Sequence, residues 1–232
     1  MRRATGALFL TLLAVPFAVL ADGGTLVKLE GAASIEGRKG QTVPAAIGTR
    51  VASGQTLATA ELTNAVVRFD DDSIFAVGEA TNFKVERFQQ PRGDRGGSAI
   101  FSLLRGGFRT ITGLIGKAKD DTYETRTGVA TIGVRGSRYG AVICRGQCPR
   151  QFQDGLWVKG EQGIIILANA AGRLELRAGQ GGYVESEASA PVRVRVTPFD
   201  DPAFAANFSF DFDFGIEVEP PRIEPEPPAS PS

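Results

Sequence analysis

Short segments with alternating apolar and polar residues recur along the chain, and they predict β-strands. The segments are rich in β-branched and aromatic residues, and Gly, Asn and Asp bound them, as in strands that end in tight turns. Within 65–69 (AVVRF) the alternation gives way to a continuous apolar run, which is typical of a strand buried on both faces. The predicted strand segments are 25–37, 50–59, 64–78, 81–88, 98–111, 122–144, 155–170, 173–186 and 191–197.

Helical periodicity is weak throughout, so the predicted fold class is all-β, a sandwich or roll of many short strands. Residues 111–119 (ITGLIGKAK) are compatible with a short helix, but Gly113 and Gly116 argue against a long one. The 29 glycines support tight turns and bulges. A weak internal similarity between 51–57 (VASGQTL) and 176–182 (LRAGQGG) indicates strands that turn in the same way.

The first 21 residues have the pattern of a secretory signal peptide. Two arginines precede an apolar run over 7–20, and small residues come just before the expected cleavage site. The run is about 14 residues long and contains Pro16, whereas a membrane-spanning helix needs roughly 20 apolar residues. We therefore predict cleavage after Ala21, export to the periplasm and no integral membrane span.

The predicted domain is 22–196, and the remaining 197–232 differ from it in composition. This last part holds eight of the 13 prolines, which predicts a disordered, extended tail. Inside it, FSFDFDF places Phe on one face and Ser or Asp on the other, as in an edge strand. That strand pairs either with this protein's own sheet or with a partner, and the candidate partner contacts are Phe208, Phe210, Phe212 and Phe214.

The net charge of zero conceals an asymmetry between the domain and the tail. Residues 22–196 carry 23 basic and 18 acidic side chains, a net charge of +5, whereas 197–232 carry one Arg and eight acidic residues, a net charge of −7. The domain has no run of five or six basic residues. Nucleic acid is therefore not an expected partner.

Cys144 and Cys148 (CRGQCP) are the two cysteines of the chain. In an exported protein, a pair so close together favours a disulfide that closes a small loop. A metal site is the alternative, but the chain has no His, and two thiolates do not complete a tetrahedral site. We expect no metal and no cofactor, and a disulfide that fixes the shape of a turn.

The glycine-rich segment 126–140 (RTGVATIGVRGSRYG) raises the question of a phosphate-binding loop. Neither the Walker spacing nor a G-x-G-x-x-G that opens a helix is present, and the chain continues as a strand. Gly133 and Gly136 therefore predict a β-bulge or a close crossing of strands. Arg135 and Arg138 are interpreted as surface or ion-pair residues, with anion binding as the alternative.

The densest acidic site, Asp70–Ser73 (DDDS), lies between two strand-like runs and predicts a hairpin turn. Calcium binding is the alternative, although the EF-hand spacing is absent. Without His the chain has no Ser-His-Asp or Cys-His unit, so we predict that it is not an enzyme. A carboxylate pair for glycoside chemistry is the remaining enzymatic alternative.

Four aromatic residues are interpreted as core or half-buried packing, with a glycan-binding platform as the alternative. They are Tyr139, Phe152, Trp157 and Tyr183.

Several short motifs follow one another in a fixed order over roughly 25–186: Gly54-Gln55-Thr56-Leu57, Thr59, Asp72-Ser73, Leu104-Arg105-Gly106-Gly107 and Gly133-Val134-Arg135-Gly136-Ser137. This ordered set resembles the FecR domain, a periplasmic module named after an iron-citrate sensor regulator. The closing strands in 155–184 and the loop between the two cysteines are also similar to features of this family. Asp72 stands where the family has a turn Gly, and Ser137 where it has Thr.

The resemblance implies an exported, non-enzymatic interaction or signalling module of the Gram-negative cell envelope. The family supplies no catalytic residues to transfer. The expected partner is another envelope protein, bound through the Phe208–Phe214 strand or the Cys144–Cys148 loop. A cell-wall or glycan-binding module, using aromatic residues such as Trp157, is the alternative function.

Overall fold

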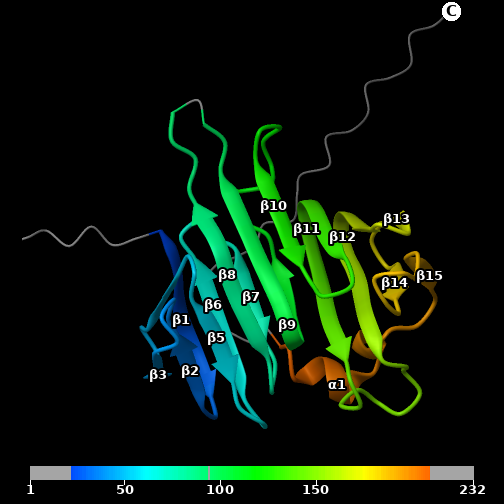
Figure 1. Cartoon of the computed structure of the whole chain (residues 1–232), viewed down its shortest axis with the longest axis horizontal. Coiled ribbons are helices and arrows are strands. Elements are labelled where there is room, and N and C mark those ends of the chain that lie inside the picture. Colours follow the sequence, from blue (N-terminus) through cyan, green and yellow to red (C-terminus); the bar gives the residue numbers. More distant parts are fainter. Residues whose placement is uncertain (1–21, 94, 210–232) are drawn as a thin grey trace, which may run out of the picture.

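The computed structural model describes residues 22–93 and 95–209 (Figure 1). Over these residues the chain forms 15 strands, one turn of 3-10 helix and a short α-helix, which confirms the all-β prediction. Residues 112–121 form turns instead of the short helix considered above. The elements are β1 (Gly23–Glu30), β2 (Ala33–Glu36), β3 (Thr42–Ala45), β4 (Arg50–Ala52), β5 (Thr56–Thr59), β6 (Asn64–Phe69), β7 (Ile74–Val77), β8 (Asn82–Gln89), β9 (Ser98–Ile111), β10 (Thr122–Arg126), β11 (Thr131–Cys144), β12 (Gly155–Asn169), β13 (Gly172–Leu176), β14 (Gly181–Val184), β15 (Val192–Val194), η1 (Pro198–Asp200) and α1 (Pro202–Ala206).

The strands are arranged in two layers that share three long strands. The first layer runs β3-β2-β5-β8-β9-β10-β11-β12-β13, and it uses the first half of β9 and of β11 and the second half of β12. The second layer runs β4-β1-β6-β7-β9-β11-β12-β14-β15 and uses the other halves. Because β9, β11 and β12 belong to both layers, the fold is a roll closed on one side by continuous strands (Figure 1).

Each shared strand changes layer at a glycine with positive φ. These are Gly106 in β9 (φ +75°), Gly136 in β11 (+53°) and Gly163 in β12 (+76°). The register between β11 and β12 shifts around Gly136, as in a β-bulge. Left-handed backbone of this kind disfavours residues with a Cβ, which explains the glycines. The predicted bulge is therefore confirmed at Gly136, and the strand continues beyond it to Cys144. Gly133 does not form a bulge or a close crossing, because it pairs in regular register with Ile166 and has open space around it.

Replacing Gly106 by Ala is expected to lower the free energy of unfolding by about 2–4 kcal/mol. A Cβ at this position would collide with Thr81, lying 2.6 Å from its Cα, and would also force an L-residue to φ +75°. Gly136→Ala is the matched control, because its Cβ would meet nothing within 4 Å, and about 1 kcal/mol is expected. Urea unfolding measures both, and equal losses would show that packing at Gly106 is unimportant.

The core lies between the two layers and is rich in phenylalanine. Phe75 of β7, in the second layer, contacts Phe83 and Phe101 of the first layer, with ring centroids 4.8 Å apart in both pairs. Tyr139 is wholly buried and shares a hydrogen bond of 3.0 Å with Thr125. Its burial raises the pKa of its hydroxyl well above the usual range. The core therefore joins the layers through aromatic contacts as well as through the shared strands.

Candidate functional site

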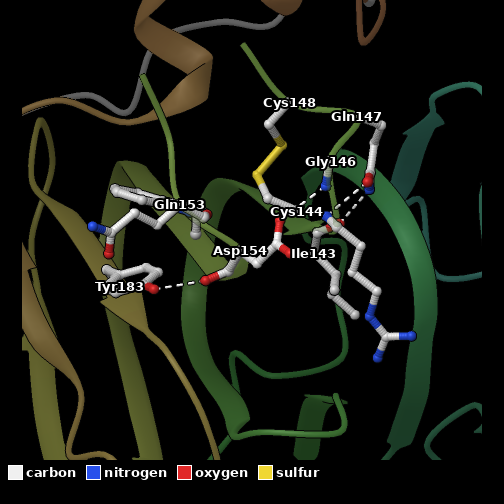
Figure 2. Close-up of a disulfide and its surroundings, with 10 residues drawn as sticks. Ile143, Cys144, Gly146, Gln147, Cys148, Gln153, Asp154 and Tyr183 are labelled. Carbon is white, nitrogen blue, oxygen red and sulfur yellow. Dashed lines mark hydrogen bonds between the residues drawn. A yellow bond between two sulfur atoms is a disulfide. The ribbon is translucent and has the colours of Figure 1, made fainter. Parts of the chain in front are cut away.

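The loop between the two cysteines is braced at the end of β11. Cys144 and Cys148 form the predicted disulfide, with Cα atoms 5.4 Å apart (Figure 2). The Gln147 side chain donates a hydrogen bond to the carbonyl of Ile143 at 2.5 Å. It also accepts one from the backbone N–H of Arg145 at 2.7 Å. The backbone N–H of Gly146 donates to a carboxylate oxygen of Asp154 at 2.9 Å (Figure 2). The loop thus presents a fixed surface at this end of the roll.

Trp157 lies beside this loop and is almost fully buried. Its ring contacts Tyr183 at 4.4 Å and Phe152 at 5.2 Å between centroids, and its indole N–H donates to the carbonyl of Gln153 at 2.9 Å. The Tyr183 hydroxyl donates to the carbonyl of Asp154 at 2.6 Å (Figure 2). Trp157 therefore has a packing role, and it offers no exposed ring face for stacking against a sugar.

Residues 197–208, which the sequence assigned to the tail, pack onto the second layer. Phe199 and Phe208 are 9% and 4% exposed and contact each other with centroids 5.4 Å apart. Phe208 lies in a turn directly after α1, and its ring covers Gly78. The packed body thus extends past 196 to Phe208, while Phe210, Phe212 and Phe214 lie outside the described residues.

Polar contacts fix the path of this segment. Asp201 begins α1 by accepting backbone hydrogen bonds from Ala203 and Phe204. Asp200 accepts a hydrogen bond from Lys159 of β12 at 2.7 Å. Burial alone would raise the pKa of Asp200, but its bonds to Lys159 and Thr197 lower it below the usual value.

One residue from each of the two partner contacts predicted from the sequence lines the same hollow. Phe208 and Gln147 of the disulfide loop both line an open cavity of about 310 Å³ beside α1, here called the α1 hollow. Most of its floor is apolar or backbone, and its rim is polar. Its lining residues are Glu61, Leu62, Glu79, Ala80, Arg105, Gly106, Gly107, Val142, Gln147, Phe204, Asn207 and Phe208.

Leu62 is the most exposed large apolar side chain at this hollow, at 90% of its surface. Its backbone has φ +54°, an unfavourable conformation for leucine, and its N–H donates to the Glu79 carboxylate at 2.8 Å. Leu62 could not be predicted from the sequence, because a single leucine in the turn ELTN carries no periodic signal. A strained, exposed leucine beside an apolar hollow is suited to contact with a partner.

The other candidate residues are held in structural interactions. Asp70–Ser73 forms the predicted hairpin turn between β6 and β7. Its three carboxylates bind different groups: Asp70 pairs with Arg50, Asp71 accepts from Ser73 and Ile115, and Asp72 pairs with Arg68. Arg138 lies 4.0 Å from Glu161, which also pairs with Arg109, so the predicted ion-pair role holds for Arg138.

Over residues 22–93 and 95–209, no group of three or more His, Cys, Asp or Glu residues is placed to hold a metal ion. Within the same ranges, no helix is long and apolar enough to span a membrane.

The Asp70–Arg50 pair predicts a pH-dependent contribution to stability. The hydrogen bond from Arg50 lowers the pKa of Asp70; burial opposes this, and the N–H of Gly23 and the charge of Arg50 reinforce it. Because the folded pKa lies below the unfolded value, the pair stabilises the fold above about pH 4, and this contribution is lost as pH falls further. Asp70→Asn should therefore destabilise the protein more at pH 7 than at pH 3 in urea unfolding.

The exposed Glu187→Gln is the control for this measurement, since that carboxylate forms no ion pair with a described residue. An Asp70→Asn penalty that is the same at both pH values would show that the carboxylate is not stabilised in the folded state.

No protein-family model matches the chain, and no curated protein matches it. Solved structures similar to it include two crystal structures of a "putative anti-sigma factor" from Parabacteroides distasonis ATCC 8503, at 1.65 Å and 2.50 Å resolution. Each aligns over 65% of this chain with a TM-score of 0.49 and 11% sequence identity. The chain spans 64% and 63% of the lengths of those two proteins, less than two thirds of each.

Proposed function

We propose that this chain is an exported, non-enzymatic FecR-like module of the Gram-negative cell envelope that binds another envelope protein at the α1 hollow. The observation that carries the proposal is the meeting of Phe208, the disulfide loop and Leu62 at one apolar cavity. Its volume suits one or two large apolar side chains of a partner, and the polar rim would set their orientation. A role in signalling would follow from the identity of that partner.

Three further features support the proposal. The ordered FecR-like motifs include Gly106 and Gly136, and both glycines are needed where strands change layer. The disulfide, the hydrogen bonds of Gln147 and the packing of α1 hold the lining in place, which reduces the entropy lost on binding. The signal-peptide pattern predicts an oxidising compartment, in which such a disulfide persists.

Site-specific photo-crosslinking in intact cells tests this function. A photo-reactive residue at Leu62 should give one defined adduct with an envelope protein, whereas the same residue at Ile47, also exposed at 66%, should give none. A probe at the exposed Asn207 should lose the adduct when Leu62→Asp is added, because a carboxylate disfavours an apolar contact. Equal adducts from Leu62 and Ile47 would contradict the proposed contact.

Two simple measurements check the rest of the proposal. Mass spectrometry of a periplasmic fraction should find a chain that begins at Asp22. Sedimentation with peptidoglycan should leave the protein in the supernatant; co-sedimentation would instead support the cell-wall-binding alternative.

A further inference from the structure

A second hollow lies on the outer face of the first layer, on the side of the roll away from the core. It has a volume of about 550 Å³ and is bounded by β11, β12, β13 and the turns that precede β10. Its floor includes Gly133 of β11, which pairs with Ile166, and Ile164, which pairs with Arg135. Both isoleucines are half-buried on an otherwise polar outer face. We call this surface the β13 groove.

Gly133 has no side chain, so the groove is deeper here than it would be with any other residue at this position of the strand. Its backbone does not have a positive φ, and a Cβ at this position would meet no atom within 4 Å. Neither the backbone conformation nor the packing therefore requires glycine here, unlike at Gly106. A glycine inside a strand weakens the strand, and one common reason for it is the close approach of another chain or a ligand.

The groove carries basic side chains without acidic partners. Lys119, Arg135 and Arg173 line it and are exposed, and none of them forms an ion pair or side-chain hydrogen bond with a described residue. Two carboxylates also line the groove, Asp121 and Glu175, so the groove is not uniformly basic.

Both carboxylates are bound within the body. Asp121 accepts backbone hydrogen bonds from Gly97, Gly116 and Ala118 at 2.7, 3.0 and 3.1 Å. Burial alone would raise its pKa, but these bonds together lower it. Glu175 pairs with Arg177 at 2.9 Å. The backbone hydrogen bonds orient Asp121 but leave its negative charge in place. The groove thus holds three cations against two carboxylates, and one of these, Glu175, is already paired with Arg177. The net charge of the groove is therefore positive, and it lies beside an apolar floor.

The chain's own tail has the complementary chemistry. Residues 216–226 (IEVEPPRIEPE) alternate apolar and acidic positions, with four Glu against one Arg. Such a segment, when extended, would place Ile and Val against the isoleucine floor and Glu toward the three cations. From Ser209 to Glu226 an extended chain covers up to about 56 Å, which exceeds the width of roughly 40 Å expected for a compact body of this size.

We propose that the β13 groove binds the acidic segment 216–226 of the same chain. The tail would lie across the hollow above Gly133, with its carboxylates near Arg135 and Arg173. Such docking would also exclude other extended acidic segments from this face. Docking at the β13 groove is independent of the α1 hollow, because the two surfaces share no lining residue.

Amide NMR spectra of two forms of the protein test the proposal: the mature chain 22–232 and a form that ends at Ser209. The tail should shift the amide signals of Gly133, Ile164 and Ile166, and raised salt should reduce the shifts. Gly133→Val fills the hollow with a residue that suits a strand, so it should keep the fold and abolish the shifts. Arg135→Glu with Arg173→Glu should weaken docking at least tenfold.

Arg150→Glu with Arg195→Glu is the matched control: it makes the same charge change at exposed arginines outside the groove and should leave the shifts intact. Groove signals that are identical with and without the tail would overturn the proposal, as would shifts that persist in Gly133→Val. Shifts that appear only as protein concentration rises would assign the segment to a second copy, and so would overturn docking within one chain.

Discussion

Ending the chain after Val196 is expected to lower the free energy of unfolding by about 3–6 kcal/mol relative to a chain that ends after Ser209. The shorter form lacks Phe199 and Phe208, which are 9% and 4% exposed in the full body. Burying one such side chain contributes roughly 1.5–3 kcal/mol. The chain that ends after Ser209 keeps every contact that the structure describes, so its free energy of unfolding should stay close to that of the whole mature chain.

The surface under this segment is shaped to receive it. A Cβ on Gly140 would lie 2.8 Å from the Phe199 ring, and a Cβ on Gly78 would collide with the Phe208 ring. These two glycines therefore leave space for the two rings. Without the segment, Val142 and part of the surrounding cluster would face water, which adds to the loss.

Trp157 provides the measurement, since it is the single tryptophan and belongs to the same hydrophobic cluster. Urea titrations followed by its fluorescence should give a lower midpoint for the chain ending at Val196, together with red-shifted emission. Phe199→Ala and Phe208→Ala should each cost about 3 kcal/mol in the full mature chain. Equal midpoints for the two truncations would show that residues 197–208 do not stabilise the body.

This result also determines how partner binding must be tested. A deletion after Val196 would remove a wall of the α1 hollow and destabilise the body at the same time. If the chain ending at Val196 lost its partner, the missing wall of the hollow and the destabilised body would explain the loss equally well. A chain that ends at Ser209 removes the acidic tail alone, and Leu62→Asp changes the hollow alone.

Local patterns predicted most of the strands and turns, because both depend on neighbouring residues, although β3 (Thr42–Ala45) lay in no predicted segment. The similarity between 51–57 and 176–182 corresponds to two equivalent turns. In each, the Gln side chain accepts from a backbone N–H three residues earlier, at 2.7 Å for Gln55 and 2.9 Å for Gln180. The glycines that precede these two glutamines, Gly54 and Gly179, have φ +85° and +80°. The sequence carries the full signal for such a turn.

Features that depend on distant residues could not be predicted in the same way. The segment 122–144 looks like one strand-rich region, but it contains β10 and β11, and β11 belongs to both layers. The α1 helix has five residues, too few for a periodic apolar stripe, so 197–208 resembled a tail. The α1 hollow combines residues from 61 to 208, and only folding brings them together.

Phe101→Ala is expected to lower the free energy of unfolding by about 3–5 kcal/mol, the range typical of a buried phenylalanine. Phe101 is fully buried in the first half of β9. Its ring contacts Phe69 at 5.2 Å and Phe75 at 4.8 Å in the second layer, and Phe83 at 5.2 Å in the first. The cavity would therefore open between the layers, where both sheets are fixed by hydrogen bonds and cannot collapse into it.

Phe101→Leu separates the loss of aromatic contacts from the loss of volume. It keeps most of the apolar volume and should cost well under half as much as Phe101→Ala. Thermal and urea unfolding should rank the proteins as wild type, Phe101→Leu and Phe101→Ala in falling stability. A small effect of Phe101→Ala, under about 1 kcal/mol, would mean that the layers are held by the shared strands β9, β11 and β12 more than by the aromatic core.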